Sequence, residues 1–440
     1  MSSVADRIVI RGAVLAGDPP RSGVTVVVEG ARIAAVAPRG EPVEPLPGDW
    51  NVDADGRLLV PGAIDAHAHL ALGPLLRLAG LPERFPGTLH GLRTGFRRPV
   101  EDRLDPAALE ALARASALSA LQAGVSCVLA LERGAAGEEL ESLAAVERAV
   151  RQVGLRAVLA YGASDFGGAE RGLAAARAAL EYGERRRGDP LVRGMAGLDG
   201  LHATTGATLE ALAEPARGFG LHASVAEDGA DLERSWALDG KRPIALLEAK
   251  GLLGPRTVVA HGSTTGSEEA SLLCRADATL VATPRSAAFW GGELPPFEIL
   301  AAHEVPVALG TDGIFHDLAG EAVALTAHLR WRRSGPPPPS ELLGHAVWPT
   351  GGTLAGQLFG ERLGAIEPGA LADLAILEWR PSGVPPEGTD GDVAILWAGA
   401  RAAWMIVGGE VRLREGVPLG VDPADVAARA SEAARRVLAD

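Results

Sequence analysis

Residues 58–69 read Leu-Leu-Val-Pro-Gly-Ala-Ile-Asp-Ala-His-Ala-His, an apolar run that ends in two histidines. The run Leu58–Asp65 predicts a short buried strand. His67 and His69 are two positions apart, so an extended backbone points both imidazoles to the same face. Two converging imidazoles suit a metal such as Zn²⁺ or Fe²⁺, which accepts nitrogen ligands readily. The alternative is a pair of hydrogen-bonded surface histidines.

Seven further apolar runs follow this one and alternate with helical stretches. The runs are Val125–Leu131, Leu155–Ala160, Val192–Leu198, Gly220–Val225, Thr257–Ala260, Ala278–Val281 and Pro306–Leu309. The helical stretches begin at Pro106 (with Asp105 as the N-cap and Gly124 beyond the end) and cover Glu138–Val153, Ala169–Arg187, Thr208–Arg217 and Ala319–Arg333. This alternation predicts an α/β fold, a closed (β/α)8 TIM-type barrel. An open doubly wound sheet is the structural alternative.

Both ends of the chain have a different sequence pattern, in which short Val- and Ile-rich runs are broken by turn residues. At the start these runs are Arg7–Leu15 and Val24–Val36, and near the end they are Ala372–Trp379, Asp392–Trp397 and Ala402–Leu413. We therefore expect a small β-sandwich domain built from residues 1–57 and 364–420. The barrel would span residues 58–363, and a C-terminal helix would span residues 421–440.

The composition narrows the class of protein. The chain has 440 residues, a net charge of −14 and no run of basic residues, which argues against nucleic acid and anionic membranes as partners. No apolar stretch approaches the ~20 residues of a membrane helix, and Asp6 and Arg7 interrupt any secretion signal. Cys127 and Cys274 lie in apolar segments, which indicates a reducing compartment. We expect a cytoplasmic protein.

Polar residues stand at other strand ends, where a barrel of this kind carries its chemistry. Asp312 follows the eighth run between glycines, and a buried carboxylate is costly unless it is paired or binds a metal. The alternative for Asp312 is a turn or a helix N-cap. His261 ends the sixth run. Glu227 follows the fifth run and could shuttle protons, or it could be a solvated loop acid.

Three residues near the same rim are candidates for substrate contacts. His202 lies just past the fourth run, and His316 follows Asp312 closely. Arg285 lies in the loop after the seventh run and could receive a carboxylate or phosphate of the substrate. A solvated loop is the alternative for Arg285.

Together these motifs resemble the amidohydrolase superfamily, in its cytosolic aminohydrolase/chlorohydrolase branch, and most closely the SsnA-type aminohydrolases. The motifs are residues 61–69, Ala260-His261-Gly262, Gly310-Thr311-Asp312-Gly313 and Gly364-Ala365-Ile366-Glu367-Pro368-Gly369. The resemblance implies that His67, His69 and Asp312 bind the metal. It also implies that Glu227 is the general acid/base, that His261 orients the hydroxide and that His202 lies on the substrate side.

One departure from the family pattern concerns the metal. The family has a metal-binding histidine three residues before the glutamate, and here that position is Ser224. Three protein ligands could suffice, His222 or His261 could move in, or the metal could be lost. The family's asparagine after the seventh strand is Ala287, and Ala282 stands near the place of its preceding histidine. With lysines only at 241 and 250, the resemblance excludes a lysine-bridged pair of metals.

The mechanistic hypothesis is a metal-dependent aminohydrolase, a deaminase of a small nitrogen heterocycle. One Zn²⁺ or Fe²⁺ ion would activate water, Asp312 would take its proton, His261 would steady the nucleophile and Glu227 would protonate the ring. One alternative is a non-catalytic, metal-poor relative that binds a small molecule or a partner. Another is a cyclic-amide hydrolase that uses the same site. A homodimer is expected by analogy alone.

Overall fold

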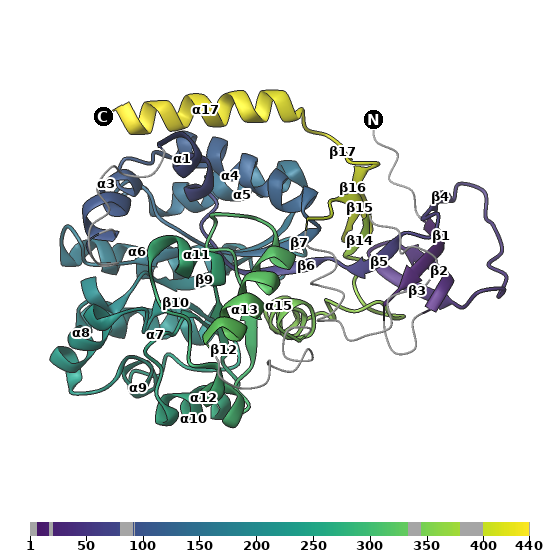
Figure 1. The fold of residues 1–440 in the computed structure, drawn as a ribbon. Coiled ribbons are helices and arrows are strands. Elements are labelled where there is room, and N and C mark those ends of the chain that lie inside the picture. Colours follow the sequence, from purple (N-terminus) through teal and green to yellow (C-terminus); the bar gives the residue numbers. More distant parts are fainter. Residues whose placement is uncertain are drawn as a thin grey trace.

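The barrel consists of eight parallel strands arranged in sequence order from β6 to β13 (Figure 1). The computed structural model describes residues 7–16, 21–79, 91, 93–332, 345–378 and 399–439. The strands are β6 (Ala63–Ala68), β7 (Val125–Glu132), β8 (Arg156–Ala163), β9 (Val192–Leu198), β10 (Leu221–Val225), β11 (Thr257–His261), β12 (Thr279–Ala282) and β13 (Val307–Leu309). The predicted α/β barrel is confirmed.

Helices follow the strands and cover the outside of the barrel. They include α4 (Pro106–Gln122), α5 (Glu139–Val153), α6 (Ala169–Arg185), α7 (Gly206–Phe219), α8 (Gly229–Asp239), α9 (Pro243–Ala249), α10 (Ser267–Arg275), α11 (Pro284–Trp290), α12 (Phe297–Ala302) and α13 (Leu318–Arg332). A further helix, α15 (Pro349–Phe359), packs instead in a separate cluster with strand residues such as Ile64 and Ala66. The carboxylate of Asp105 caps α4 by accepting a 2.7 Å bond from the Ala108 amide, as its sequence predicts. Among the described helices, none combines the length and apolar character that a membrane crossing needs.

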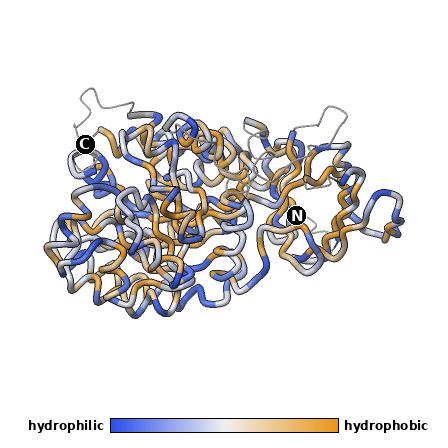
Figure 2. Tube along the Cα trace, turned by 60° about the horizontal axis from the view of Figure 1, so that its bottom comes forward, coloured by the Kyte–Doolittle hydropathy of each residue, from blue (hydrophilic) through white to orange (hydrophobic). Residues whose placement is uncertain are grey.

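Both chain ends build a second, separate sheet of nine strands. Its strands are β1 (Arg7–Leu15), β2 (Arg21–Glu29), β3 (Arg32–Ala37), β4 (Trp50–Asp53), β5 (Leu58–Pro61), β14 (Leu374–Leu377), β15 (Ala402–Val407), β16 (Glu410–Arg414) and β17 (Val417–Pro418). Strands from the two ends share one apolar core, and Figure 2 shows hydrophobic segments concentrated inside this unit and inside the barrel. Helix α17 (Pro423–Ala439) then returns to pack on α4. The predicted strand 392–397 lies outside the described residues.

The first predicted strand, Leu58–Asp65, is wrong as a single element. Its first part is β5, which pairs with β1 and β14 of the small sheet, and only β6 from Ala63 onward enters the barrel. The break falls at Gly62, where a Cβ atom would lie 2.4 Å from the side chain of Ser126. Residues 58–61, which the sequence assigned to the barrel, therefore belong to the small sheet.

The first and last strands of the barrel are joined at the ends that carry the histidines. The amide of Asp312 donates to the carbonyl of His67 at 2.9 Å. The buried carboxylate of Asp65 accepts from the Thr311 amide at 3.0 Å and from the Thr311 hydroxyl at 2.6 Å. Burial raises the pKa of Asp65 to about 6, although these bonds favour the ionised form. Residues 246 positions apart in the sequence are thus held side by side.

A buried ion pair connects the barrel to the small sheet. Arg156 begins β8, and its guanidinium binds both oxygens of Asp373, just before β14, at 2.8 and 2.9 Å. The two side chains are only 2% and 1% exposed. Asp373 also accepts from the Gly408 amide at 2.7 Å. The geometry is the bidentate arrangement in which arginine and carboxylate interact most strongly.

We expect Asp373→Ala to lower the free energy of unfolding by about 3–5 kcal/mol, because it leaves the Arg156 charge buried without its carboxylate partner. Glu361→Ala is the matched control, since Glu361 pairs with Arg32 of β3 at 2.7 Å and both side chains are partly exposed. The control should cost about 0–1 kcal/mol. Urea unfolding of the purified variants measures both values, and equal losses would contradict the special role of the Arg156–Asp373 pair.

Candidate metal and active site

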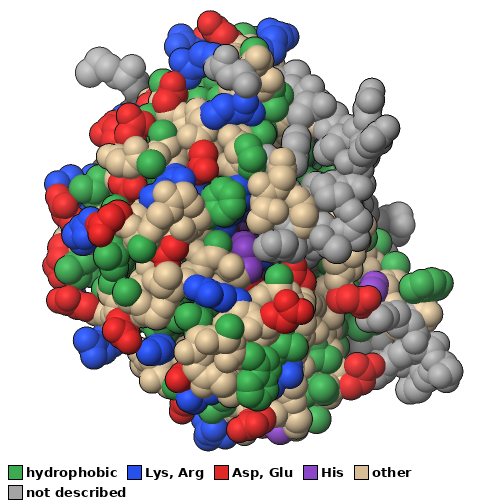
Figure 3. All heavy atoms as spheres, turned by 90° about the vertical axis from the view of Figure 1, so that its left-hand side faces the viewer, with side chains coloured by type: hydrophobic (Ala, Val, Ile, Leu, Met, Phe, Trp, Pro, Cys, Tyr) green, Lys and Arg blue, Asp and Glu red, His purple; other side chains and the backbone are tan. Residues whose placement is uncertain are grey.

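Three strand ends bring histidines and a carboxylate to one point. His67 and His69 are at the end of β6, His261 ends β11 and Asp312 follows β13. The Nε2 atoms of His67 and of His69 each lie 3.3 Å from Asp312 Oδ1. The ligand atoms of His67, His261 and Asp312 all lie within 4.8 Å of one another. These side chains are buried, and Figure 3 shows histidine surface near the centre of one face of the molecule.

Two of the converging polar atoms are buried and unpaired. Within the described chain, His67 Nε2 and Asp312 Oδ1 have no hydrogen-bond partner. Burial lowers the pKa of His67, so its ring is neutral at pH 7 and can present a lone pair. Burial alone would raise the pKa of Asp312, but the neighbouring imidazoles and the Arg97 guanidinium hold that pKa well below its usual value. A neutral imidazole facing an ionised carboxylate fits a divalent cation.

His222 lies behind His67 rather than beside the proposed metal position. Its Nε2 atom is 2.8 Å from His67 Nδ1, the ring atom that points away from Asp312. In the tautomer in which His67 Nδ1–H donates this bond, His67 Nε2 keeps its lone pair. Ser224, two residues after His222 on β10, is buried and offers a hydroxyl where the family pattern has an imidazole. Of the two replacements that the sequence left open, the geometry therefore favours His261 over His222.

Two hydroxyl groups that the sequence did not single out orient Asp312 and His261. Ser286 Oγ donates to Asp312 Oδ2 at 2.5 Å, which leaves Oδ1 to face the histidines. Thr283 Oγ1 lies 3.2 Å from His261 Nδ1, so His261 Nε2 points into the site. Such outer partners fix the direction of a ligand's lone pair. No spacing in the sequence signals them, because they come from a different strand end than the residues they hold.

The backbone at these strand ends is strained. His261 and Asp312 have φ angles of 72° and 53°, and Ala226 beside Glu227 has 55°, in the left-handed region that non-glycine residues rarely adopt. Each such residue costs on the order of 1–3 kcal/mol, and the strain persists only where the surroundings impose it. Two of these strained residues, His261 and Asp312, belong to the cluster itself.

Glu227 lies next to the cluster of His67, His261 and Asp312. Its Oε2 atom lies 3.7 Å from His261 Nε2 and also contacts the guanidinium of Arg93. Burial raises the pKa of Glu227, while the Arg93 charge opposes the rise. His202 stands next to it, with its Nδ1 atom 3.3 Å from both Asp231 Oδ1 and an Arg93 nitrogen. The structure thus brings the proposed acid and the proposed substrate-side histidine together.

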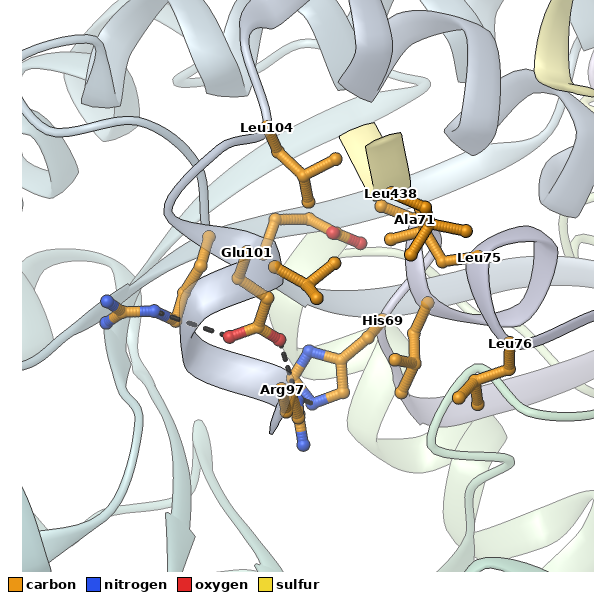
Figure 4. A pocket seen from close by; sticks show the side chains of 12 residues that line it. His69, Ala71, Leu75, Leu76, Arg97, Glu101, Leu104 and Leu438 are labelled. Carbon is orange, nitrogen blue, oxygen red and sulfur yellow. Dashed lines mark hydrogen bonds and ion pairs between the residues drawn. The ribbon is translucent and has the colours of Figure 1, made fainter. Parts of the chain in front are cut away.

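Two arginines enter the site from a short π-helix, Arg93–Arg97, in the segment after α1 (Leu72–Ala79). Arg93 contacts Glu227, and an Arg97 nitrogen lies 2.7 Å from His69 Nε2. Figure 4 shows Arg97 beside the ring of His69, with the carboxylate of Glu101 directed towards Arg97. π-Helical turns are frequent at functional sites. The abundance of arginine in this segment was the only signal in the sequence, and it does not say which arginine reaches which residue.

The remaining substrate candidates lie outside the cluster. Arg285 donates to Glu321 of α13 at 2.7 Å and stacks 4.9 Å from the Phe315 ring, so its charge is already engaged. His316 is buried, and burial lowers its pKa to about 3. Neither ring nitrogen of His316 has a partner within the described residues. Contacts of Arg285 and His316 with a substrate remain predictions.

Comparisons with known proteins agree with this architecture. The profile of the Amidohydrolase family matches residues 58–411. A 5-methylthioadenosine/S-adenosylhomocysteine deaminase of Archaeoglobus fulgidus is 28% identical, over 94% of this chain and 95% of its own length. An 8-oxoguanine deaminase of Pseudomonas aeruginosa is 27% identical, also over 94% and 95%. The crystal structure of an adenosine deaminase from Xanthomonas campestris has the same fold, with a TM-score of 0.82, 21% identity and coverage of 98% and 99%.

We expect His222→Leu to weaken Zn²⁺ binding by about 10–100-fold, because removing an outer partner frees the ring of a metal ligand to turn. Competition with a chromogenic chelator measures the affinity. His303→Leu is the control, since His303 bonds to Ser267 in an exposed position away from the cluster. Equal affinities of the two variants would contradict an orienting role for His222.

Proposed function

Since the chain belongs to the amidohydrolase family, we propose that it is a metal-dependent aminohydrolase that removes an amino group from a small nitrogen heterocycle. The observation that carries the proposal is the convergence of His67 Nε2, His261 and Asp312 Oδ1 at the carboxyl ends of three strands. This is the face on which barrels of this type carry their catalytic residues.

The donor set fits one divalent ion. Two imidazole nitrogens and one carboxylate oxygen suit Zn²⁺ or Fe²⁺, and catalytic sites commonly use three protein ligands and leave a position open. His67, His261 and Asp312 would hold the ion, and His69 stands beside them. When bound, such an ion lowers the pKa of a water towards ~7 and so supplies a nucleophile at neutral pH.

The protein's own groups position protons around that water and the substrate. Burial lowers the pKa of His261 to about 4, so the ring is neutral and Nε2 can offer its lone pair to the ion. Asp312 is ionised and able to accept a proton. The raised pKa of Glu227 favours its protonated form more than in water, so it can donate a proton to a ring nitrogen.

The curated relatives support a heterocyclic amine as the substrate class. The names of the two quoted above describe deaminases of an adenosine derivative and of 8-oxoguanine, and this chain spans 95% of each. In such substrates an electron-poor ring carbon bears the amino group, and ammonia is the leaving group. Cyclic-amide hydrolysis would use the same residues but would open a ring without releasing ammonia.

We expect Glu227→Gln to lower kcat by about 10²–10⁴-fold, because the amide has no acidic proton to transfer to the ring. Ammonia release from adenosine-type nucleosides, aminopurines, pterins and aminotriazines identifies the substrate and measures the loss. The control is Glu233→Gln, an exposed position on α8. Unchanged turnover of the Glu227 variant, with bound metal equal to wild type, would rule out its role as the acid.

We expect about one equivalent of zinc or iron in protein purified without chelator, and metal removal should abolish ammonia release. Because a ligand bound only to the folded state stabilises it, by about 2.7 kcal/mol at a hundred times its Kd, removal should also lower Tm. Metal analysis, activity and thermal unfolding before and after chelation measure these effects. Full activity in the metal-free protein would overturn the proposed chemistry.

A non-catalytic relative is the second candidate function. Two observations favour it: Ser224 replaces a ligand of the family pattern, and Arg97 already contacts His69. A protein that takes up no metal on titration would support this candidate and contradict the aminohydrolase.

A further inference from the structure

His69 differs from the other residues of the cluster in what its free nitrogen touches. Its Nε2 atom lies 2.7 Å from a nitrogen of the Arg97 guanidinium as well as 3.3 Å from Asp312 Oδ1. His67 Nε2, in contrast, has no hydrogen-bond partner within the described residues. His69 is also absent from the group of ligand atoms that lie within 4.8 Å of one another.

One lone pair cannot serve two cations. A neutral imidazole has a single in-plane lone pair, and Arg97 carries only donors and stays charged under all ordinary conditions. When the guanidinium donates to His69 Nε2, that lone pair is unavailable to a metal. Metal ligation by His69 and the observed bond to Arg97 therefore exclude each other.

Arg97 is fixed in this position from behind. Its Nε atom binds Glu101 at 2.6 Å, and the two side chains are only 12% and 9% exposed. Glu101 in turn lies 3.6 Å from Arg133 Nε at the end of β7. Moving Arg97 out of the site would weaken a buried ion pair, which is costly in a poorly solvated environment.

The next residue anchors the same segment to the barrel. Arg98 pairs with Asp199 at 2.7 Å and donates to Ser164 at 2.8 Å, just past the ends of β9 and β8. Arg98 is among the largest fully buried side chains of the protein. The segment Arg93–Glu101 is therefore anchored at the barrel mouth by buried contacts. The contact of Arg97 with His69 comes from this anchored segment and not from a freely rotating, exposed side chain.

We infer that Arg97 withholds His69 from the metal, so that the ion is held by His67, His261 and Asp312. His261 then takes over a coordinating position at the barrel mouth, where Ser224 offers no imidazole. This inference rests on the proposed function, because it assumes that a metal binds. It makes Arg97 a positioning residue and leaves open coordination sites for water and substrate.

The test is Zn²⁺ affinity of the full-length apoprotein, measured by chelator competition for His261→Ala, His69→Ala, Arg97→Gln and the double variant Arg97→Gln/His69→Ala. We expect His261→Ala to lose about 100-fold or more in affinity, whereas His69→Ala should stay within about threefold of wild type. Arg97→Gln should bind about tenfold more tightly by releasing His69, and the double variant should lose that gain. Arg103→Gln, at an exposed position close to the same segment, is the control and should not change affinity.

A loss in His69→Ala as large as that in His261→Ala would overturn the inference and leave the aminohydrolase proposal intact. Unchanged or weaker Zn²⁺ binding by a folded Arg97→Gln would overturn it as well. Absence of Zn²⁺ uptake by the wild-type protein would overturn both this inference and the proposed function. If Arg97→Gln fails to fold, as judged by circular dichroism, the comparison of His69→Ala with His261→Ala still decides the ligand set.

Discussion

The site depends on the contact between the first strand of the barrel, β6, and the residues that follow its last strand, β13. Asp65 accepts both hydrogen bonds that Thr311 can donate, and the Asp312 amide donates to the carbonyl of His67. The approach is so close that a Cβ atom at Gly313 would lie 2.0 Å from the carbonyl oxygen of His69. Residues from the first and last strands can share one ion or one substrate only because these hydrogen bonds hold the two strands together.

Burial shapes the chemistry of the cluster through two opposing effects. Removal from water lowers the pKa of the histidines and thus keeps their lone pairs available, and it raises the pKa of Glu227. The neighbouring imidazoles and the Arg97 guanidinium work the other way on Asp312 and keep it ionised. In the proposed function, the same side-chain types would therefore act as ligand, base or acid according to the neighbours that each one contacts.

The sequence predicted the eight barrel strands and the helices between them well, because buried parallel strands and amphipathic helices leave a strong local pattern. It placed the boundary between the two sheets wrongly, since Leu58–Pro61 and the strand after Gly62 look alike as apolar runs. Ser286 and Thr283 went unnoticed, because their importance comes from Asp312 and His261 and not from their neighbours in the chain. The sequence also left two replacements for the missing ligand open, and it could not say where the arginines lie.

The sequence by itself determined the barrel and the strand ends on which chemistry would stand, because period and composition are local properties. It also determined that Ser224 breaks the family's ligand pattern. Only the tertiary structure decided that His222 lies behind His67, that His261 joins His67 and Asp312 in one cluster, and that Arg97 reaches His69. The reason is physical: lone-pair direction and ion pairing depend on angstrom-scale distances between segments far apart in the chain, and those distances exist only once the barrel has closed.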